Sequence, residues 1–435
     1  MKMALLKNAE SKNAIWLICS RVIQMILSLF VSIISARYLG PSNYGLISYG
    51  IAYVSLFTSL CNLGINSVII KNFYDKPEDE GLTIGTSIVL RILSGVFSAI
   101  SIFGISLILD YGETITIVVV CLCSASLVVQ ALDTFSYWFQ SRYQSKKTAI
   151  ATLIAFIVTS SYKILLLVLN KSVIWFAAAN ALDYLVLGLL LFAFFKMCKG
   201  PKLRFSWIKG RELLRVSYHY ILSGAMVAIY GQTDKLMLKQ MLNETSVGYY
   251  AIATSVCGVW TFVLTAIIDS MYPTILKLKE VDDKEYIRKN QQLYCIVFYI
   301  SVFVSVCFLL LGRIAIRILY GNDYLPASRV LMVITWYTAF AYLGVARNAW
   351  MVCEGKQKYL KWMYLFAAII NVGLNFALIP FLHEVGAALA SLITQLFTSI
   401  VLPMMWKGTR PNSIMMLRAI AFGGVFRHSK RETAD

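Results

Sequence analysis

The stretch Ala36-Arg-Tyr-Leu-Gly-Pro-Ser-Asn-Tyr-Gly-Leu-Ile-Ser-Tyr49 lies between two long apolar runs and determines how they connect. The four residues at its centre, Gly40 to Asn43, are typical of turns and are poor residues for a helix interior. The stretch therefore predicts a tight reversal at one face of a membrane, with a helix on either side.

A fainter copy of this stretch occurs near the middle of the chain. An offset of 203 residues places it on Met241-Leu-Asn-Glu-Thr-Ser-Val-Gly-Tyr-Tyr250, with a leucine, a hydroxyl side chain and a glycine in matching positions. Two matching hairpins suggest a chain of two matching halves.

The composition is that of an integral membrane protein. Of the 435 residues, 59% are hydrophobic and only 14% are charged, with a mean hydropathy of +0.70, which is too apolar for an ordinary soluble protein. A bilayer core about 30 Å thick needs roughly 20 apolar residues per helix. Lipid offers no partner for open backbone groups, and the apolar runs do not alternate as barrel strands do. The fold class that we predict is therefore an all-α membrane protein.

Twelve apolar runs are long enough to span a bilayer. They cover residues 14–36, 45–70, 82–109, 114–138, 148–169, 172–195, 216–238, 247–272, 293–312, 328–351, 361–380 and 385–406. Because six runs precede the middle of the chain and six follow, any repeat would be parallel, related by an axis along the membrane normal.

The positive charges orient these spans. Of the forty Lys and Arg residues, twenty-nine fall on the side that holds both termini and six on the opposite side, which predicts cytoplasmic termini. The same imbalance accounts for the net charge of +18 better than nucleic-acid binding does. We expect an N-terminal lobe at 1–199, a cytoplasmic connector at 200–214, a C-terminal lobe at 215–406 and a basic tail at 407–435.

Charged residues inside predicted spans are the candidate site residues. A charge at the bilayer centre costs about 2.5–3.5 kcal/mol, so each must face water, pair internally or reach an interface. The candidate cations for a polar cavity are Arg21, Arg91, Lys163 and Arg347, and the candidate carboxylates for proton or ion coupling are Asp183, Asp269 and Asp234. Snorkelling and structural anchoring remain open for each.

The sequence contains no catalytic constellation. The acidic groups at residues 78–80 and 282–283 lie among lysines in short inner loops, and there is no phosphate-cradling glycine loop. The nine cysteines lie mostly in apolar runs without CxxC pairing, which favours buried small side chains over a metal site. We expect no cofactor and no direct use of nucleotide hydrolysis.

Several segments, taken in order, resemble the Wzx-type O-antigen and polysaccharide flippases of the multidrug/oligosaccharidyl-lipid/polysaccharide exporter superfamily. The resemblance covers nearly the whole chain. The segments that carry it are Ala36–Gly45, Asp234 with the hairpin Leu242–Tyr250, Leu319–Ala327, Glu354–Lys356, Asn371–Pro380 and Val385–Ala388.

The resemblance implies a MATE-like transporter of about twelve helices in two six-helix lobes that opens alternately to each face. It implies transport of an undecaprenyl-pyrophosphate-linked oligosaccharide across a bacterial inner membrane, before a polymerase and a chain-length regulator act. The intramembrane cations would neutralise the pyrophosphate, and a proton or sodium gradient would drive transport.

Two alternatives stay open. A multidrug or cation exporter of the same superfamily would favour an acidic cavity, whereas the intramembrane charges here are five basic against four acidic. A polytopic sugar or acyl transferase would need catalytic Asp or His in a substantial loop, and every loop here is short.

Overall fold

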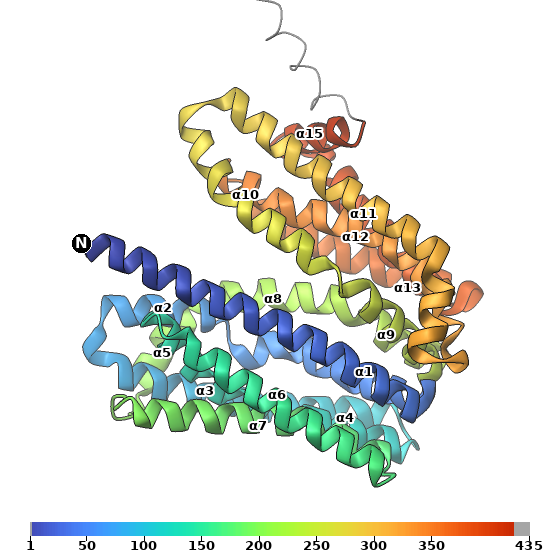
Figure 1. Cartoon of the computed structure of the whole chain (residues 1–435), viewed down its shortest axis with the longest axis horizontal. Helices are drawn as coiled ribbons and strands as arrows, with labels where there is room; N and C mark the ends of the chain where they lie inside the picture. The colour runs from blue at the N-terminus through green and yellow to red at the C-terminus, as the bar shows by residue number, and fades with distance from the viewer. Residues whose placement is uncertain (1, 422–435) are drawn as a thin grey trace, which may run out of the picture. The chain divides into compact units, whose positions relative to one another are not determined.

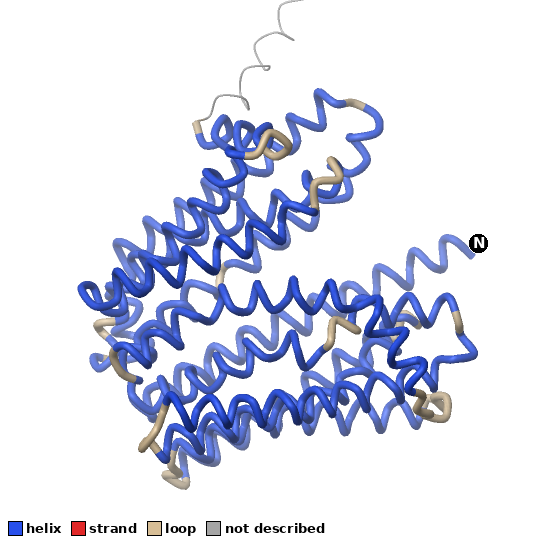
Figure 2. Tube along the Cα trace, turned by 180° about the vertical axis from the view of Figure 1, so that it is seen from behind, coloured by secondary structure: helices blue, strands red, loops and turns tan. Residues whose placement is uncertain are grey.

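The computed structural model describes residues 2–421, and describes side chains from Ile23 onward except at positions 67 and 223. Over these residues the chain consists of helices joined by short loops (Figure 2). Among them, nine helical stretches are long and apolar enough to cross a membrane. The prediction of an all-helical polytopic membrane protein is confirmed.

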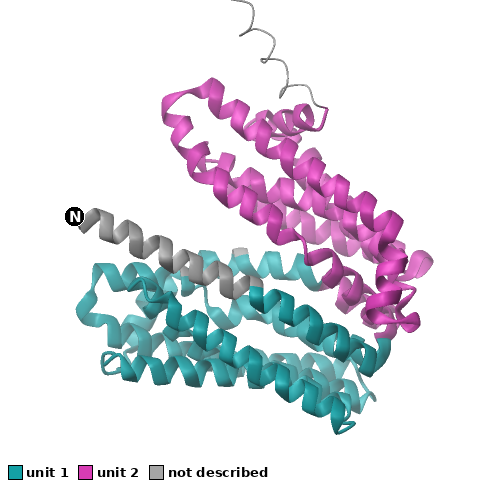
Figure 3. Ribbon diagram, in the orientation of Figure 1, with its two compact units in different colours: residues 1–232 teal, residues 233–435 magenta. Residues whose placement is uncertain are grey.

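The chain divides into two compact units, residues 1–232 and 233–435 (Figure 3). The division falls inside one helix, α8. The helices before α8 are α1 (Lys2–Asn62), α2 (Asn66–Asp75), α3 (Glu80–Leu109), α4 (Thr114–Val129), α5 (Thr134–Ser141), α6 (Ser145–Val168) and α7 (Val173–Met197) (Figure 1). The remaining helices are α8 (Trp207–Met241), α9 (Glu244–Gly258), α10 (Thr261–Val281), α11 (Asp283–Tyr320), α12 (Ala327–Cys353), α13 (Lys358–Leu396), α14 (Leu402–Met405) and α15 (Arg410–Ile420).

The connector that follows α7 is held against α3 within unit 1. The Arg204 amide donates to the Gly81 carbonyl at 3.1 Å, and the Ser206 amide donates to Oγ1 of Thr86 at 3.1 Å. The backbones approach so closely that a Cβ added to Gly81 would lie 2.2 Å from the Lys202 carbonyl oxygen. The sequence predicted a connector at 200–214 between two lobes, whereas these contacts attach its first residues to unit 1. The predicted lobe boundaries stay a prediction.

The reversal in the stretch 36–49 occurs at Gly40, which interrupts α1 with φ 69° and ψ 171°. In a straight helix, Ser32 and Tyr44 would be separated by about 18 Å along the axis. Their hydroxyls instead lie 2.9 Å apart. The two segments of α1 therefore fold back on each other, with Pro41 in the first turn of the second segment, where its missing amide costs nothing.

A second reversal interrupts α13 at His383, with φ 52° and ψ −134°. A Cβ added to Gly386 would lie 2.5 Å from the Leu378 carbonyl oxygen, although these residues would be about 12 Å apart along a straight helix. The glycine therefore permits the returning segment to pack backbone against backbone. The adjacent apolar runs at 361–380 and 385–406 correspond to the two arms of this hairpin.

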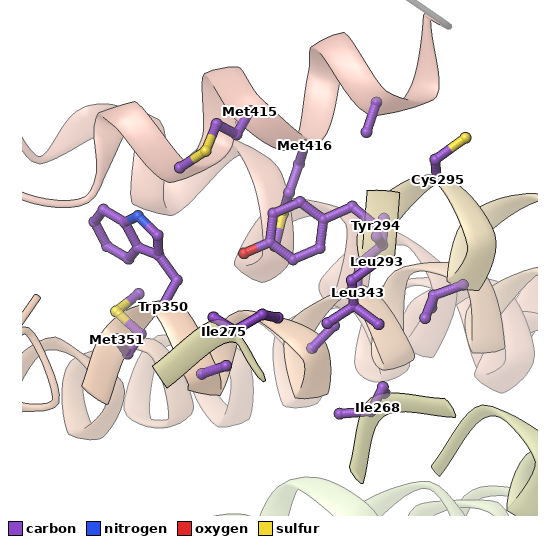
Figure 4. Packing of buried hydrophobic residues seen from close by; sticks show 14 of the residues in the cluster. Ile268, Ile275, Leu293, Tyr294, Cys295, Leu343, Trp350, Met351, Met415 and Met416 are labelled. Atoms are coloured by element: carbon purple, nitrogen blue, oxygen red, sulfur yellow. The ribbon is translucent and has the colours of Figure 1, made fainter. Parts of the chain in front are cut away.

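The interior of unit 2 is apolar where α10, α11, α12 and α15 meet. Ile275, Tyr294, Trp350 and Met416 belong to one buried cluster there (Figure 4). Polar and charged side chains are also buried in this unit, and inside an apolar bundle such side chains are informative about function.

Candidate functional site

Arg91 of α3 is the most buried of the candidate cations whose side chains the structure describes, with 1% of its surface exposed. Its guanidinium donates to Oδ1 of Asn62 at 2.5 Å and to Oγ1 of Thr134 at 2.9 Å. Asn62 is the last residue of α1, before a break at Leu63 and Gly64, and Thr134 opens α5 after the short 3₁₀ segment η2 (Gln130–Asp133). Arg91 therefore holds two interrupted helices together.

A chain of polar side chains continues from Arg91 across unit 1. Tyr184 of α7 accepts a hydrogen bond from Nε2 of Gln130 at 3.4 Å, and it interacts electrostatically with both Asp133 and Asp183. Asp183 in turn accepts from Oγ1 of Thr159 at 3.0 Å. The candidate residues Arg91 and Asp183, which the sequence does not link, therefore belong to one polar chain in the structure.

Lys163 of α6 lies at the far end of this chain and interacts electrostatically with Asp183. Both side chains are partly buried. A cation and a carboxylate set beside each other inside an apolar bundle lower the cost of burying either one. Unit 1 therefore contains a buried cation, Arg91, and a partly buried one, Lys163, with the carboxylates Asp133 and Asp183 beside them.

Arg347 of α12 lies in unit 2 and is 5% exposed. Its Nη1 donates to the carbonyls of Thr398 at 3.2 Å and Ser399 at 3.4 Å. These carbonyls belong to η4 (Phe397–Val401), a π-helical turn whose widened backbone leaves acceptors available. In this conformation Arg347 is engaged by backbone oxygens of its own unit.

Two further candidates, Arg21 and Asp269, have no described partner. Arg21 lies outside the residues whose side chains the structure describes, so its role stays a prediction. Asp269 of α10 is exposed, and over the described part of the chain no hydrogen bond or ion pair engages it.

Asp234 of α8 lies at the centre of a buried polar cluster in unit 2. Its carboxylate is 5% exposed and accepts hydrogen bonds from Nδ2 of Asn375 at 2.7 Å, from Oγ of Ser391 at 2.5 Å and from the hydroxyl of Tyr250. Asn375 and Ser391 lie on the two arms of the α13 hairpin, and Tyr250 lies on α9. One carboxylate therefore ties together three helices.

The surroundings of Asp234 are rich in side-chain oxygens. Asn371, one turn before Asn375, accepts from Nδ2 of Asn375 at 3.1 Å, and its own amide lies 3.4 Å from Oγ of Ser391. Oδ1 of Asn375 is buried without a hydrogen-bond partner, as is the hydroxyl of Thr394, one turn after Ser391. No described group of three His, Cys, Asp or Glu side chains is arranged for a transition metal. The oxygens instead suit a proton or a hard monovalent cation.

The sequence analysis identified Asp234 but missed the residues that surround it. Asn371 and Asn375 were visible as an i, i+4 pair of amides inside an apolar run, a spacing that puts both on one helix face. Ser391 and Tyr250 carried no such signal. Asp110, also missed, is a buried carboxylate of unit 1 that accepts from a tyrosine of α1 at 3.0 Å.

Comparison with known proteins shows which family this chain belongs to. The family model described as "Polysaccharide biosynthesis protein" matches residues 11–279, more than half of the chain. The chain belongs to this polysaccharide biosynthesis protein family. Among curated members that it resembles is the Staphylococcus aureus "Capsular polysaccharide biosynthesis protein CapF", 20% identical, with 88% of this chain and 96% of the relative covered.

A second relative of this polysaccharide biosynthesis protein is the "Putative O-antigen transporter" of Escherichia coli K12, 22% identical over 90% of this chain and 95% of the relative. Among solved structures, the lipid II flippase MurJ in an inward closed conformation matches with a TM-score of 0.68 at 16% identity, covering 94% of this chain and 92% of that one. An inward-facing MATE transporter matches with a TM-score of 0.65 at 15% identity, covering 90% and 95%. The fold is therefore MATE-like and MurJ-like.

Proposed function

We propose that this protein is a flippase that moves undecaprenyl-pyrophosphate-linked O-antigen, or related surface-polysaccharide, repeat units from the cytoplasmic to the periplasmic leaflet. The observation that carries the proposal is the match over nearly the full length of both chains to a relative named as an O-antigen transporter. The likeness in fold to a lipid II flippase adds support, because that protein also handles a lipid-borne cargo.

A twelve-span topology with cytoplasmic termini fits this role. Two of the nine candidate spans are divided by the reversals at Gly40 and His383, and α8 is long enough to cross although it is more polar. If each divided stretch counts as two spans and α8 is added, the number of spans is twelve, the same as the number of apolar runs in the sequence. In a bacterial inner membrane, the protein would then deliver its cargo to a polymerase and chain-length regulator on the periplasmic side.

The buried cations of unit 1 supply the chemistry for an anionic cargo. The acceptors that Arg91 uses, Asn62 and Thr134, are neutral, so phosphate oxygens would make stronger, charge-assisted bonds in their place. Lys163 offers a second positive charge in the same unit. Arg21 and Arg347 complete the set of cations that we propose for the pyrophosphate.

Asp234 is the best-supported coupling site among the three carboxylates. Loading it with a proton or a cation would change its bonds to Tyr250, Asn375 and Ser391, and so would change how α8, α9 and the α13 hairpin pack. Asp269 lacks such connections, and Asp183 is connected within unit 1. Neutralising Asp234 as Asp234→Asn should abolish the dependence of transport on the ion gradient.

The test is transport in proteoliposomes that contain the purified protein and a fluorescent undecaprenyl-pyrophosphate-linked oligosaccharide. Flipping is measured as the fraction of label exposed to an impermeant quencher. Movement of this lipid, with none of a cationic dye, supports the flippase. Export of the dye without movement of the lipid would identify a multidrug exporter instead.

A matched pair of variants tests the proposed cations. Lys163→Gln should slow flipping about 10-fold, because a desolvated ion contact contributes more than about 1 kcal/mol. Lys171→Gln, an equal change at an exposed lysine, should leave the rate unchanged. Equal rates for both variants would exclude Lys163 from cargo binding but would leave the flippase assignment standing.

A further inference from the structure

Unit 2 contains a cavity of about 420 Å³ at the turn between α11 and α12. It is lined by Arg313, Leu325, Pro326, Ser328, Arg329 and Met332. Arg313 comes from the last two turns of α11 and Arg329 from the first turn of α12, so the turn brings two guanidinium groups to one cavity. This cavity is separate from the Asp234 cluster, with which it shares no residue.

Both arginines are exposed at the wall of this cavity. Over the residues that the structure describes, no carboxylate lies within 4 Å of the guanidinium of Arg313 or of Arg329. Two like charges at one cavity repel each other unless an anion lies between them. A guanidinium presents a planar fork of donors that matches phosphate oxygens, and two forks suit one phosphate group.

The remaining walls of the cavity indicate that the anion carries an apolar tail. Leu325, Pro326 and Met332 line it beside the arginines, and the Ser328 hydroxyl is already bonded to the Leu325 carbonyl at 2.7 Å. On α11 the neighbouring Leu310 is 71% exposed. Further along the same helix, Ile314 and Ile318 are also exposed, which is the pattern of a lipid-facing surface.

The placement of the arginines along the chain supports the same conclusion. The side of the membrane predicted to be periplasmic carries only six Lys and Arg residues, and three of them are Arg313, Arg317 and Arg329. Positive charge is disfavoured in the short loops of that side. Its concentration at one turn therefore calls for a local binding role.

We propose that Arg313 and Arg329 bind the phosphate of an anionic phospholipid, with an acyl chain against Leu325 and Met332. The lipid fills the cavity and neutralises the two arginines at the end of the α11–α12 pair. This site is independent of the cargo and of the coupling carboxylate, so its test does not depend on transport.

The test is native mass spectrometry of the full-length protein in detergent, titrated with phosphatidylglycerol or with phosphatidylcholine of the same chain length. The wild type should bind phosphatidylglycerol at least 10-fold more tightly than the double variant Arg313→Gln/Arg329→Gln does. Arg317→Gln is the matched control, because Arg317 is exposed one turn further along α11 and does not line the cavity. It should bind as the wild type does.

A cavity-filling variant separates the site from general surface charge. Met332→Trp keeps both arginines but fills the space for the chain, so it should also lose phosphatidylglycerol. Equal losses in Arg317→Gln and the double variant, or unchanged binding in Met332→Trp, would overturn the proposal. Binding of inorganic pyrophosphate by the wild type without binding of the phospholipid would also overturn it, since a free anion would then be the ligand.

Discussion

Asp234→Asn should destabilise unit 2 because it removes the charge on which three hydrogen bonds converge. Bonds to a charged group contribute about 1.5–3 kcal/mol each, against about 0.5–1.5 kcal/mol for neutral ones, so three bonds lose about 3 kcal/mol together. Removing a buried charge relieves part of its desolvation cost. We therefore expect a net loss of about 2 kcal/mol in the free energy of unfolding.

Thermal unfolding of the purified protein in detergent, followed by tryptophan fluorescence, measures this loss. For a unit of about 200 residues, 1 kcal/mol corresponds to about 2–4 °C, so the Tm should fall by about 6 °C. Asp269→Asn is the matched control, since the same chemical change at an exposed carboxylate should shift the Tm by less than about 1 °C. Equal shifts for the two variants would refute the role assigned to the Asp234 cluster.

Three further substitutions test unit 1. Gly81→Ala should displace the connector, because its Cβ would meet the Lys202 carbonyl at 2.2 Å, and limited proteolysis of the connector should accelerate; Gly104→Ala on the same helix, with open space around it, should not. Arg91→Lys should lower the free energy of unfolding by about 2 kcal/mol, because a single ammonium group cannot donate to Asn62 and Thr134 with the geometry of the planar guanidinium. An unchanged Tm would count against this account. Gly40→Ala should cost about 1–3 kcal/mol through backbone strain alone, since no atom lies within 4 Å of the new Cβ, and the same thermal scan measures it.

Most of the fold could be predicted from the sequence because lipid imposes simple rules on the chain. Apolar runs of spanning length located the helices, and the turn residues around Gly40 located the first reversal. The reversal at His383 was predicted only as a gap between two runs, since neither His383 nor the preceding Pro380 specifies a hairpin by itself. Its geometry depends on the contact between Gly386 and the Leu378 carbonyl, which is tertiary.

The candidate site was less predictable, because a charge inside a span does not reveal its partners. Arg91 and Arg347 were both candidate cavity cations in the sequence. In the structure, Arg91 donates to neutral side chains at two helix breaks, whereas Arg347 donates to backbone carbonyls of a π-helical turn. Asp234 and Asp269 were both candidate coupling carboxylates, and the α13 hairpin brings Asn375 and Ser391 to only one of them, Asp234.

Arg91 in unit 1 and Asp234 in unit 2 are buried charges of opposite sign with different partners, and this difference supports a division of roles. In unit 1, Arg91 is surrounded by acceptors, so the ligand that can compete for it is an anion. In unit 2, Asp234 is surrounded by donors and by unpaired side-chain oxygens, so a proton or a cation can compete with those donors for its carboxylate. A cargo with a pyrophosphate and a coupling ion of opposite charge are the two ligands that the proposed flippase needs. If both ligands acted on the same residue, they would neutralise each other there. A cation in one unit and a carboxylate in the other allow each ligand to change the packing of its own helices.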